Sequence, residues 1–153
     1  MHIAEMNIAR MRYPLDDPRM DEFRRALDTV NLLADRSPGF VWRYTGESGA
    51  ATDTRINDDP LWILNMSVWK DADTLEKFVW QTLHKRIYNN KGRWLEPPKA
   101  PHFVMWPVAE GAIPTVDEGL ERLEHIRAHG PSEFAYGWES LPHLKLWMAQ
   151  RCG

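Results

Sequence analysis

Three side chains that can take part in hydrogen bonding recur at every second position in residues 61–69, LWILNMSVW. Asn65, Ser67 and Trp69 would lie on one face of a β-strand, together with Ile63, because successive side chains of a strand point to opposite faces. An amide or indole N–H group on such a face can donate a hydrogen bond to an oxygen that becomes negative during a reaction. This stretch is therefore the first candidate for a site.

A fourth polar side chain, Asn7, occupies a similar place in residues 2–11, where the apolar residues Ala4, Met6 and Ile8 alternate with other residues. We predict a strand here, with helices packed on the Ala4, Met6 and Ile8 face and Asn7 on the opposite face. Asn7 and Asn65 could together hold an enolate or phenolate oxygen. The alternative is that these amides bond to each other or to the wall of the fold, because buried amides need partners.

A helix is predicted directly after the strand of residues 61–69. Asp71 or Asp73 can cap its first turn, and an apolar stripe runs from Leu75 to Ile87. Beside that stripe, a row of side chains is spaced by four residues: Trp80, His84 and Tyr88. His84 could act as a general base near neutral pH, although a lone histidine beside an apolar stripe is also typical of a structural residue.

Further binding residues come from the aromatic and basic side chains. Trp42 and Trp69 could sandwich a flat aromatic molecule or simply fill the core, and Arg43 could bind an anion or form a salt bridge. His102, at the start of a strand over residues 102–108, could lie at the mouth of a cavity. The predicted substrate-binding set is Trp42, Arg43, Ser67, Trp80, Tyr88, Trp94, His102 and Trp106.

Composition narrows the classes of protein that the chain can belong to. Its 153 residues carry 19 basic and 22 acidic side chains, with no basic stripe for nucleic acid and no apolar run that could cross a membrane. The N-terminus lacks the apolar core of a signal peptide, and the single Cys152 allows no internal disulfide or cysteine metal cluster. We expect a cytoplasmic protein with no resident metal; a metal bound by His125 and His129 is not favoured.

The order of predicted elements is β-α-β-β-α-β, followed by a helix at residues 115–129 with Thr115 as its cap and by a tail at 132–153. Residues 46–60 form a polar loop or lid. Two βαβ units joined by a hairpin predict an α+β, ferredoxin-like antiparallel sheet in one domain over residues 1–131. The sheet face opposite the helices remains partly apolar, so we expect a second copy to cover it in a homodimer, and the tail to pack on the body or on the partner.

Several segments together resemble the bacterial domain-of-unknown-function family DUF3291. They are HIAEMNIARMR, the DDPRM segment, SPGFVWR, the NMSVW strand, a helix ending in H-x8-RW, FVMWPV and PTVDEGLERLEHIRAHGP, and they span residues 2–131. This family is grouped with the dimeric α/β-barrel proteins, which agrees with the topology predicted above.

Two spacings are similar to those of the cofactor-free antibiotic-biosynthesis monooxygenases in that class. An asparagine lies four residues before a tryptophan, here Asn65 and Trp69, and a histidine follows about fifteen residues later, here His84. The resemblance implies oxidation of a flat aromatic or polyketide-like molecule without a cofactor, with Asn7, Asn65, Trp69 and His84 as catalytic residues and His102 as an alternative proton carrier. One alternative is a heme-binding or heme-degrading protein that uses His84 as the ligand. Another is a non-catalytic dimer that binds a small molecule.

Overall fold

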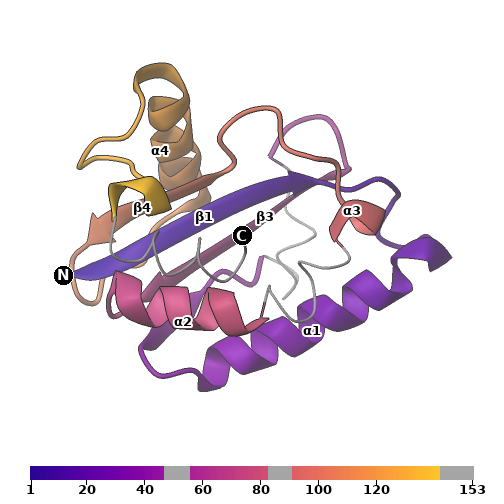
Figure 1. Ribbon diagram of the computed structural model, residues 1–153, viewed down its shortest axis with the longest axis horizontal. Helices are drawn as coiled ribbons and strands as arrows, with labels where there is room; N and C mark the ends of the chain where they lie inside the picture. Colours follow the sequence, from indigo (N-terminus) through magenta and orange to yellow (C-terminus); the bar gives the residue numbers. More distant parts are fainter. Residues whose placement is uncertain (47–55, 83–90, 142–153) are drawn as a thin grey trace.

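The computed structural model describes residues 1–46, 56–82 and 91–141, and four strands in this part of the chain form one sheet (Figure 1). The sheet order is β2-β3-β1-β4, and every neighbouring pair is antiparallel. The strands are β1 (His2–Arg10), β2 (Phe40–Arg43), β3 (Trp62–Trp69) and β4 (Phe103–Val108). The two central strands are therefore β1 and β3, the strands that carry Asn7 and Asn65.

The helices begin where the sequence places capping residues. Asp71 Oδ1 accepts a hydrogen bond of 2.8 Å from the N–H of Thr74, and Thr115 Oγ1 accepts one of 3.1 Å from the N–H of Glu118. Gly130, with φ of 78°, ends the last long helix. The helical segments are η1 (Pro18–Met20), α1 (Asp21–Arg36), α2 (Ala72–Thr82), α3 (Lys91–Trp94), α4 (Val116–His129) and η5 (Trp138–Ser140).

The predicted fold class is confirmed. The element order β1-α1-β2-β3-α2-β4, with β1 between β3 and β4, is the antiparallel ferredoxin-like arrangement, and α4 is the predicted additional helix. Among the described residues, no helix is both long enough and apolar enough to cross a membrane.

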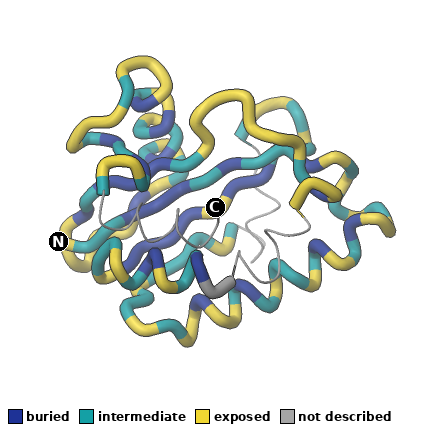
Figure 2. The backbone as a smooth tube through the Cα atoms, in the orientation of Figure 1, coloured by how far each residue is buried: buried dark blue, intermediate teal, exposed yellow. Residues whose placement is uncertain are grey.

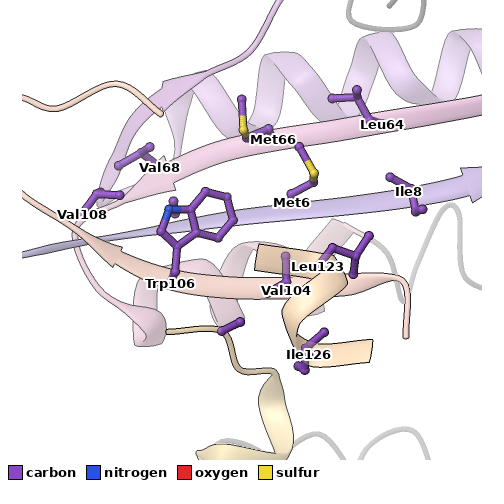
Figure 3. Packing of buried hydrophobic residues seen from close by; sticks show 12 residues of the cluster. Met6, Ile8, Leu64, Met66, Val68, Val104, Trp106, Val108, Leu123 and Ile126 are labelled. Atoms are coloured by element: carbon purple, nitrogen blue, oxygen red, sulfur yellow. The ribbon is translucent and has the colours of Figure 1, made fainter. Parts of the chain in front are cut away.

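The prediction of which sheet face the helices cover is wrong for α1 and α2. Ala34 of α1 and Leu75 of α2 form one buried cluster with Trp69 and Met105, so these helices cover the face that also carries Asn7. The Ala4, Met6 and Ile8 face is instead covered by α4, through residues such as Leu123 and Ile126 (Figure 3). Both sheet faces carry apolar side chains, so the alternation in β1 alone could not assign the helices to one of them. Figure 1 shows α4 on one side of the sheet and α1 and α2 on the other.

A β-bulge in β2 corrects a second prediction. Phe40 pairs with Trp69, but Trp42 pairs with the adjacent residue Val68, so Val41 is an extra residue in the ladder. Phe40 consequently lies on the face covered by α1 and α2, and Trp42 lies on the α4 face. The sequence alternation had placed both rings on one face.

The described part of the predicted tail, residues 132–141, packs along β4. Tyr136 and Met105 exchange two backbone hydrogen bonds of 2.7 and 3.0 Å, and the Trp138 ring stacks on Phe103 with centroids 5.4 Å apart. This segment covers part of the outer edge of β4, where Pro107 also lies, as expected for a proline that cannot donate to a ladder. The rest of the tail, 142–153, lies outside the described residues, as does most of the predicted loop at 46–60.

Candidate functional site

The sheet face under α1 and α2 carries two separate apolar clusters. At one end, Phe23 and Trp94 pack with Ile63, with ring centroids of the two aromatics 5.5 Å apart. At the other end, Trp69 stacks on Phe78 at 4.9 Å. Between Ile63 and Trp69, the same face of β3 carries only polar side chains. We call this region the polar strip; it consists of Glu5, Asn7, Asn65 and Ser67.

The register of the two central strands fixes the layout of the polar strip. Asn7 pairs with Asn65, and Glu5 pairs with Ser67, in the β1–β3 ladder. Opposed residues on one face have Cβ atoms roughly 5 Å apart, so the two amides lie next to each other. The prediction that Asn7 and Asn65 share a face is therefore confirmed, and the structure adds that they are direct partners.

A chain of hydrogen bonds joins four of the side chains on this face. The indole N–H of Trp69 donates to Ser67 Oγ at 2.9 Å, and the Ser67 hydroxyl donates to Glu5 Oε1 at 2.6 Å. Asn7 Nδ2 donates to the other carboxylate oxygen, Glu5 Oε2, at 3.2 Å. Each carboxylate oxygen of Glu5 thus accepts one hydrogen bond, Oε1 from Ser67 and Oε2 from Asn7.

Glu5 lies at the centre of these hydrogen bonds, and it was not among the residues predicted from the sequence. Only 3% of its surface is exposed. Burial raises the pKa of Glu5 from 4.5 to about 7, although the hydrogen bonds from Ser67 and Asn7 act to lower it. The signal was present in the sequence, because Glu5 is a charged residue in the middle of a strand and two residues from Asn7.

Asn65 differs from the rest of the polar strip because it is exposed, although it lies in the middle of a central strand. Its neighbours along β3, Leu64 and Met66, are buried on the other face. Solvent therefore reaches the polar strip, which is the floor of the space between the two apolar clusters, at Asn65. Asn7 beside it is half-buried. Within the described residues, no hydrogen bond uses the side chain of Asn65. Figure 2 shows the largely buried strands against the exposed outer faces of the helices.

Trp69 and Arg43 lie on the same face as the polar strip, but their polar groups are already engaged. Trp69 has no exposed surface, and its N–H is used by Ser67. Arg43 pairs with Ser67 across the sheet and forms a two-pronged ion pair with Asp35 of α1, at 2.8 and 3.3 Å. The salt bridge that the sequence analysis weighed for Arg43 is present.

Other predicted binding residues lie away from the polar strip. Trp42 and Trp106 pack in the α4-side core, where the N–H of Trp106 donates to Glu118 at 3.2 Å. His102 directly precedes β4, where alternation from Phe103 also assigns it to the α4 side. Desolvation and the nearby charges of Lys91 and Arg127 lower the pKa of His102.

Two predicted tryptophans lie on the side of α1 and α2. Trp94, at the end of α3, is buried beside Phe23 in the cluster at Ile63. Trp80 is buried on α2. Predicted residues His84 and Tyr88 lie outside the described residues, so their positions relative to the polar strip stay predictions.

No three histidine, cysteine, aspartate or glutamate side chains in the described part of the chain are grouped so that they could hold a metal ion. The rings of His125 and His129 lie 4.9 Å apart on α4, beside a shallow depression lined also by Phe134. This depression is on the far side of the sheet from the polar strip.

These features define a ferredoxin-like α+β protein whose sheet bears a partly open polar strip between two apolar clusters. The chain belongs to the family described as a domain of unknown function, DUF3291, whose model matches residues 2–151. The match extends beyond residue 131, so the family unit includes most of the tail. No curated protein matches the chain.

Among solved structures, the chain is similar to SnoaB, a cofactor-independent oxygenase from Streptomyces nogalater. The identity is 15%, the match covers 71% of this chain and 94% of SnoaB, and the TM-score is 0.50. A mutant form of SnoaB, in which an asparagine is replaced by alanine, matches at 16% identity, with 74% and 98% coverage and a TM-score of 0.49. At this identity, the likeness establishes the shared fold.

Proposed function

We propose that the protein is an enzyme that oxidises a flat aromatic or polyketide-like molecule with dioxygen and without a bound cofactor. The observation that carries the proposal is the exposed Asn65 amide on the sheet floor, next to Asn7 and between two apolar clusters. Apolar walls with a few polar groups are typical of small-molecule sites. The fold shared with a cofactor-independent oxygenase supports the same proposal.

The reaction requires that the substrate first loses a proton. A ring CH2 group beside a carbonyl becomes a carbanion whose charge spreads onto the carbonyl oxygen. Electrons from this carbanion reduce dioxygen; one oxygen atom is retained in a new C=O bond, and the other leaves as water with the two hydrogens. The substrate supplies both the electrons and the protons, so the equation balances without a further reductant.

In this proposal, Asn65 donates its amide N–H to the oxygen that becomes negative, and Asn7 lies beside it as the second amide. Trp69 supports the site by holding Ser67, because its N–H is committed there. His84 is the proposed base, as the sequence analysis suggested. His102 is a weaker candidate because it is assigned to the other sheet face.

The test is oxygen uptake with dithranol, a hydroxylated anthrone that has such a CH2 group. We expect uptake by the wild-type protein and a loss of about 100-fold in the Asn65→Ala variant, the order of magnitude for removal of one oxyanion donor. Asn57→Ala is the matched control, because it removes the same side chain from the exposed turn before β3. Equal rates in wild type and Asn65→Ala would contradict the proposed role.

A homodimer is part of the same proposal, but through the other sheet face. The face with Ile3, Ile63 and Trp69, which a second copy was expected to cover, lies under α1 and α2 instead. On the α4 side of the sheet, Trp42, Tyr44 and Trp62 are only partly buried around the core. A second copy packed there would remove these rings from water. Light scattering coupled to size-exclusion chromatography should give twice the chain mass of 17.9 kDa, and a Trp42→Glu variant should shift this mass toward the monomer.

A further inference from the structure

We propose that Glu5 is a positioning residue whose protonation decides which group of Asn7, its carbonyl oxygen or its NH2, faces a molecule bound on the polar strip. The orientation of Asn7 would regulate ligand binding at the proposed site. Only its effect on catalysis rests on the proposed function. It is carried by the hydrogen-bond chain from Trp69 through Ser67 to Glu5 and Asn7.

When Glu5 is ionised, both of its oxygens can only accept hydrogen bonds. Asn7 must therefore turn its nitrogen toward Glu5 Oε2, as observed at 3.2 Å. The Oδ1 atom of Asn7 is then directed away from Glu5. In this state, Asn7 offers a hydrogen-bond acceptor to the floor, which suits a neutral hydroxyl group of a ligand and opposes a negative oxygen.

When Glu5 is protonated, it has one O–H group that needs an acceptor, because a buried donor without a partner is costly. Ser67 Oγ already accepts from Trp69 and donates to Glu5 Oε1. These two hydrogen bonds can therefore stay unchanged. A proton on Oε2 is accommodated if the Asn7 amide turns by half a rotation and accepts it with Oδ1. The NH2 group of Asn7 then faces the floor beside Asn65.

The surroundings of Glu5 allow this change of charge. Burial raises the pKa of Glu5 and the hydrogen bonds from Ser67 and Asn7 lower it, with no contribution from a charged neighbour among the described residues. Arg43 lies across the sheet from Glu5, because both residues pair with Ser67, but it forms an ion pair with Asp35 of α1. Two other titratable groups belong to elements packed on this face: Glu76 of α2 is buried, and the pKa of Tyr136, after α4, is raised by burial.

For the proposed enzyme, the consequence is a link between a proton on Glu5 and binding of an oxyanion. The protonated state presents two adjacent amide donors, from Asn7 and Asn65, where the ionised state presents one donor and one acceptor. Affinity for an aromatic oxyanion should therefore weaken by about tenfold for each pH unit above the midpoint of Glu5.

The test observes the Asn7 side chain directly, in the full chain and without any substrate. On β1, Asn7 lies between Glu5 and Ala9 on the same face of the strand. A rotation of the Asn7 amide therefore moves its protons away from Glu5 and toward the Ala9 methyl group. We would record NMR spectra of the isotope-labelled protein from pH 4.5 to well above pH 7. The Asn7 resonance is assigned by its loss in Asn7→Ser, and the Asn57 amide is the internal control.

We expect the Asn7 resonance to shift with a midpoint near pH 7, and its nuclear Overhauser contact with the Ala9 methyl group to strengthen below that midpoint. In Glu5→Gln, which cannot ionise, both changes should disappear. A contact pattern that stays constant across the range would overturn the inference, even if Glu5 titrates. If Glu5→Gln does not fold, the wild-type contacts decide the question.

This outcome is independent of the oxygenase proposal. If the amide turns but dithranol causes no oxygen uptake, the inference stands and the proposed function fails. If oxygen is consumed in an Asn65-dependent manner while the Asn7 contacts never change, the proposed function stands and the role of Glu5 fails.

Discussion

Asn7 and Asn65 are direct partners across the two central strands, yet Asn65 is exposed while Asn7 is half-buried. A central strand under two helices is normally covered along its length. Here, the helix-side apolar residues gather at Ile63 and at Trp69 and leave the residues between them to polar side chains. The opening at Asn65 follows from this separation of the two clusters.

The buried carboxyl group of Glu5 predicts a stability that falls as pH rises. Its pKa is 4.5 when unfolded and about 7 when folded, so the folded state binds the proton more tightly between these values. The loss of unfolding free energy begins above about pH 4.5 and is complete above about pH 7, with an upper limit of about 3 kcal/mol. Urea titrations of wild type and Glu5→Gln should converge at low pH and diverge toward pH 8, with the variant more stable. Parallel curves would contradict the burial argument.

Removal of the Ser67 hydroxyl should destabilise the fold. Ser67→Ala leaves the buried N–H of Trp69 without its acceptor and removes one donor from Glu5. We expect a cost of about 1–3 kcal/mol in unfolding free energy, measured by chemical denaturation. The control is Ser140→Ala, at an exposed position in η5, which should change the unfolding free energy by less than about 0.5 kcal/mol. Equal effects of the two substitutions would show that the hydrogen-bond chain contributes little.

The turn into β2 depends on a glycine. Gly39 has φ of +86°, and an added Cβ would lie 2.5 Å from Thr74 Cβ on α2. Gly39→Ala should cost about 2–4 kcal/mol, because strain at a positive φ adds to a steric clash. Gly92→Ala is the matched control: it lies in α3 with nothing within 4 Å of the added atom, and it should be neutral or slightly stabilising. Thermal unfolding of both variants tests this prediction. Similar unfolding midpoints for the two would contradict the close approach of α2 to Gly39.

The absence of a cofactor in the proposed reaction can be tested by spectroscopy. We expect the purified protein to have no absorption band above that of its tryptophans and to consume oxygen with dithranol without any addition. Titration with hemin should then give no sharp Soret band. A Soret band at one equivalent per chain that is lost in His84→Ala would instead support the heme alternative.

The local parts of the fold could be predicted because their signals are local. Asp71 and Thr115 cap helices within a few residues of themselves, and Gly130 ends α4 through its own backbone conformation. The alternation in β3 likewise assigned Asn65, Ser67 and Trp69 to one face. None of these predictions required knowledge of distant contacts.

Predictions that depended on long-range packing were less successful. The helices cover the face with Glu5 and Asn7 because Trp69 and Met105 provide an apolar surface there, which no single strand reveals. The bulge at Val41 moved Trp42 to the other face, since one extra residue reverses the alternation. Glu5 was missed because a glutamate in an alternating strand resembles a solvent-facing residue until its partner, Ser67, is known.

The most direct measurement is a map of where a flat aromatic ligand binds. A hydroxylated anthraquinone has the ring system of dithranol but no CH2 group to oxidise, so it can be titrated into the isotope-labelled protein and followed by NMR. We expect the resonances of the Asn65 and Asn7 side-chain amides to shift most, and Asn65→Ala to weaken binding. Shifts confined to the depression at His125 and Phe134 on α4, with Asn65 unchanged, would contradict it.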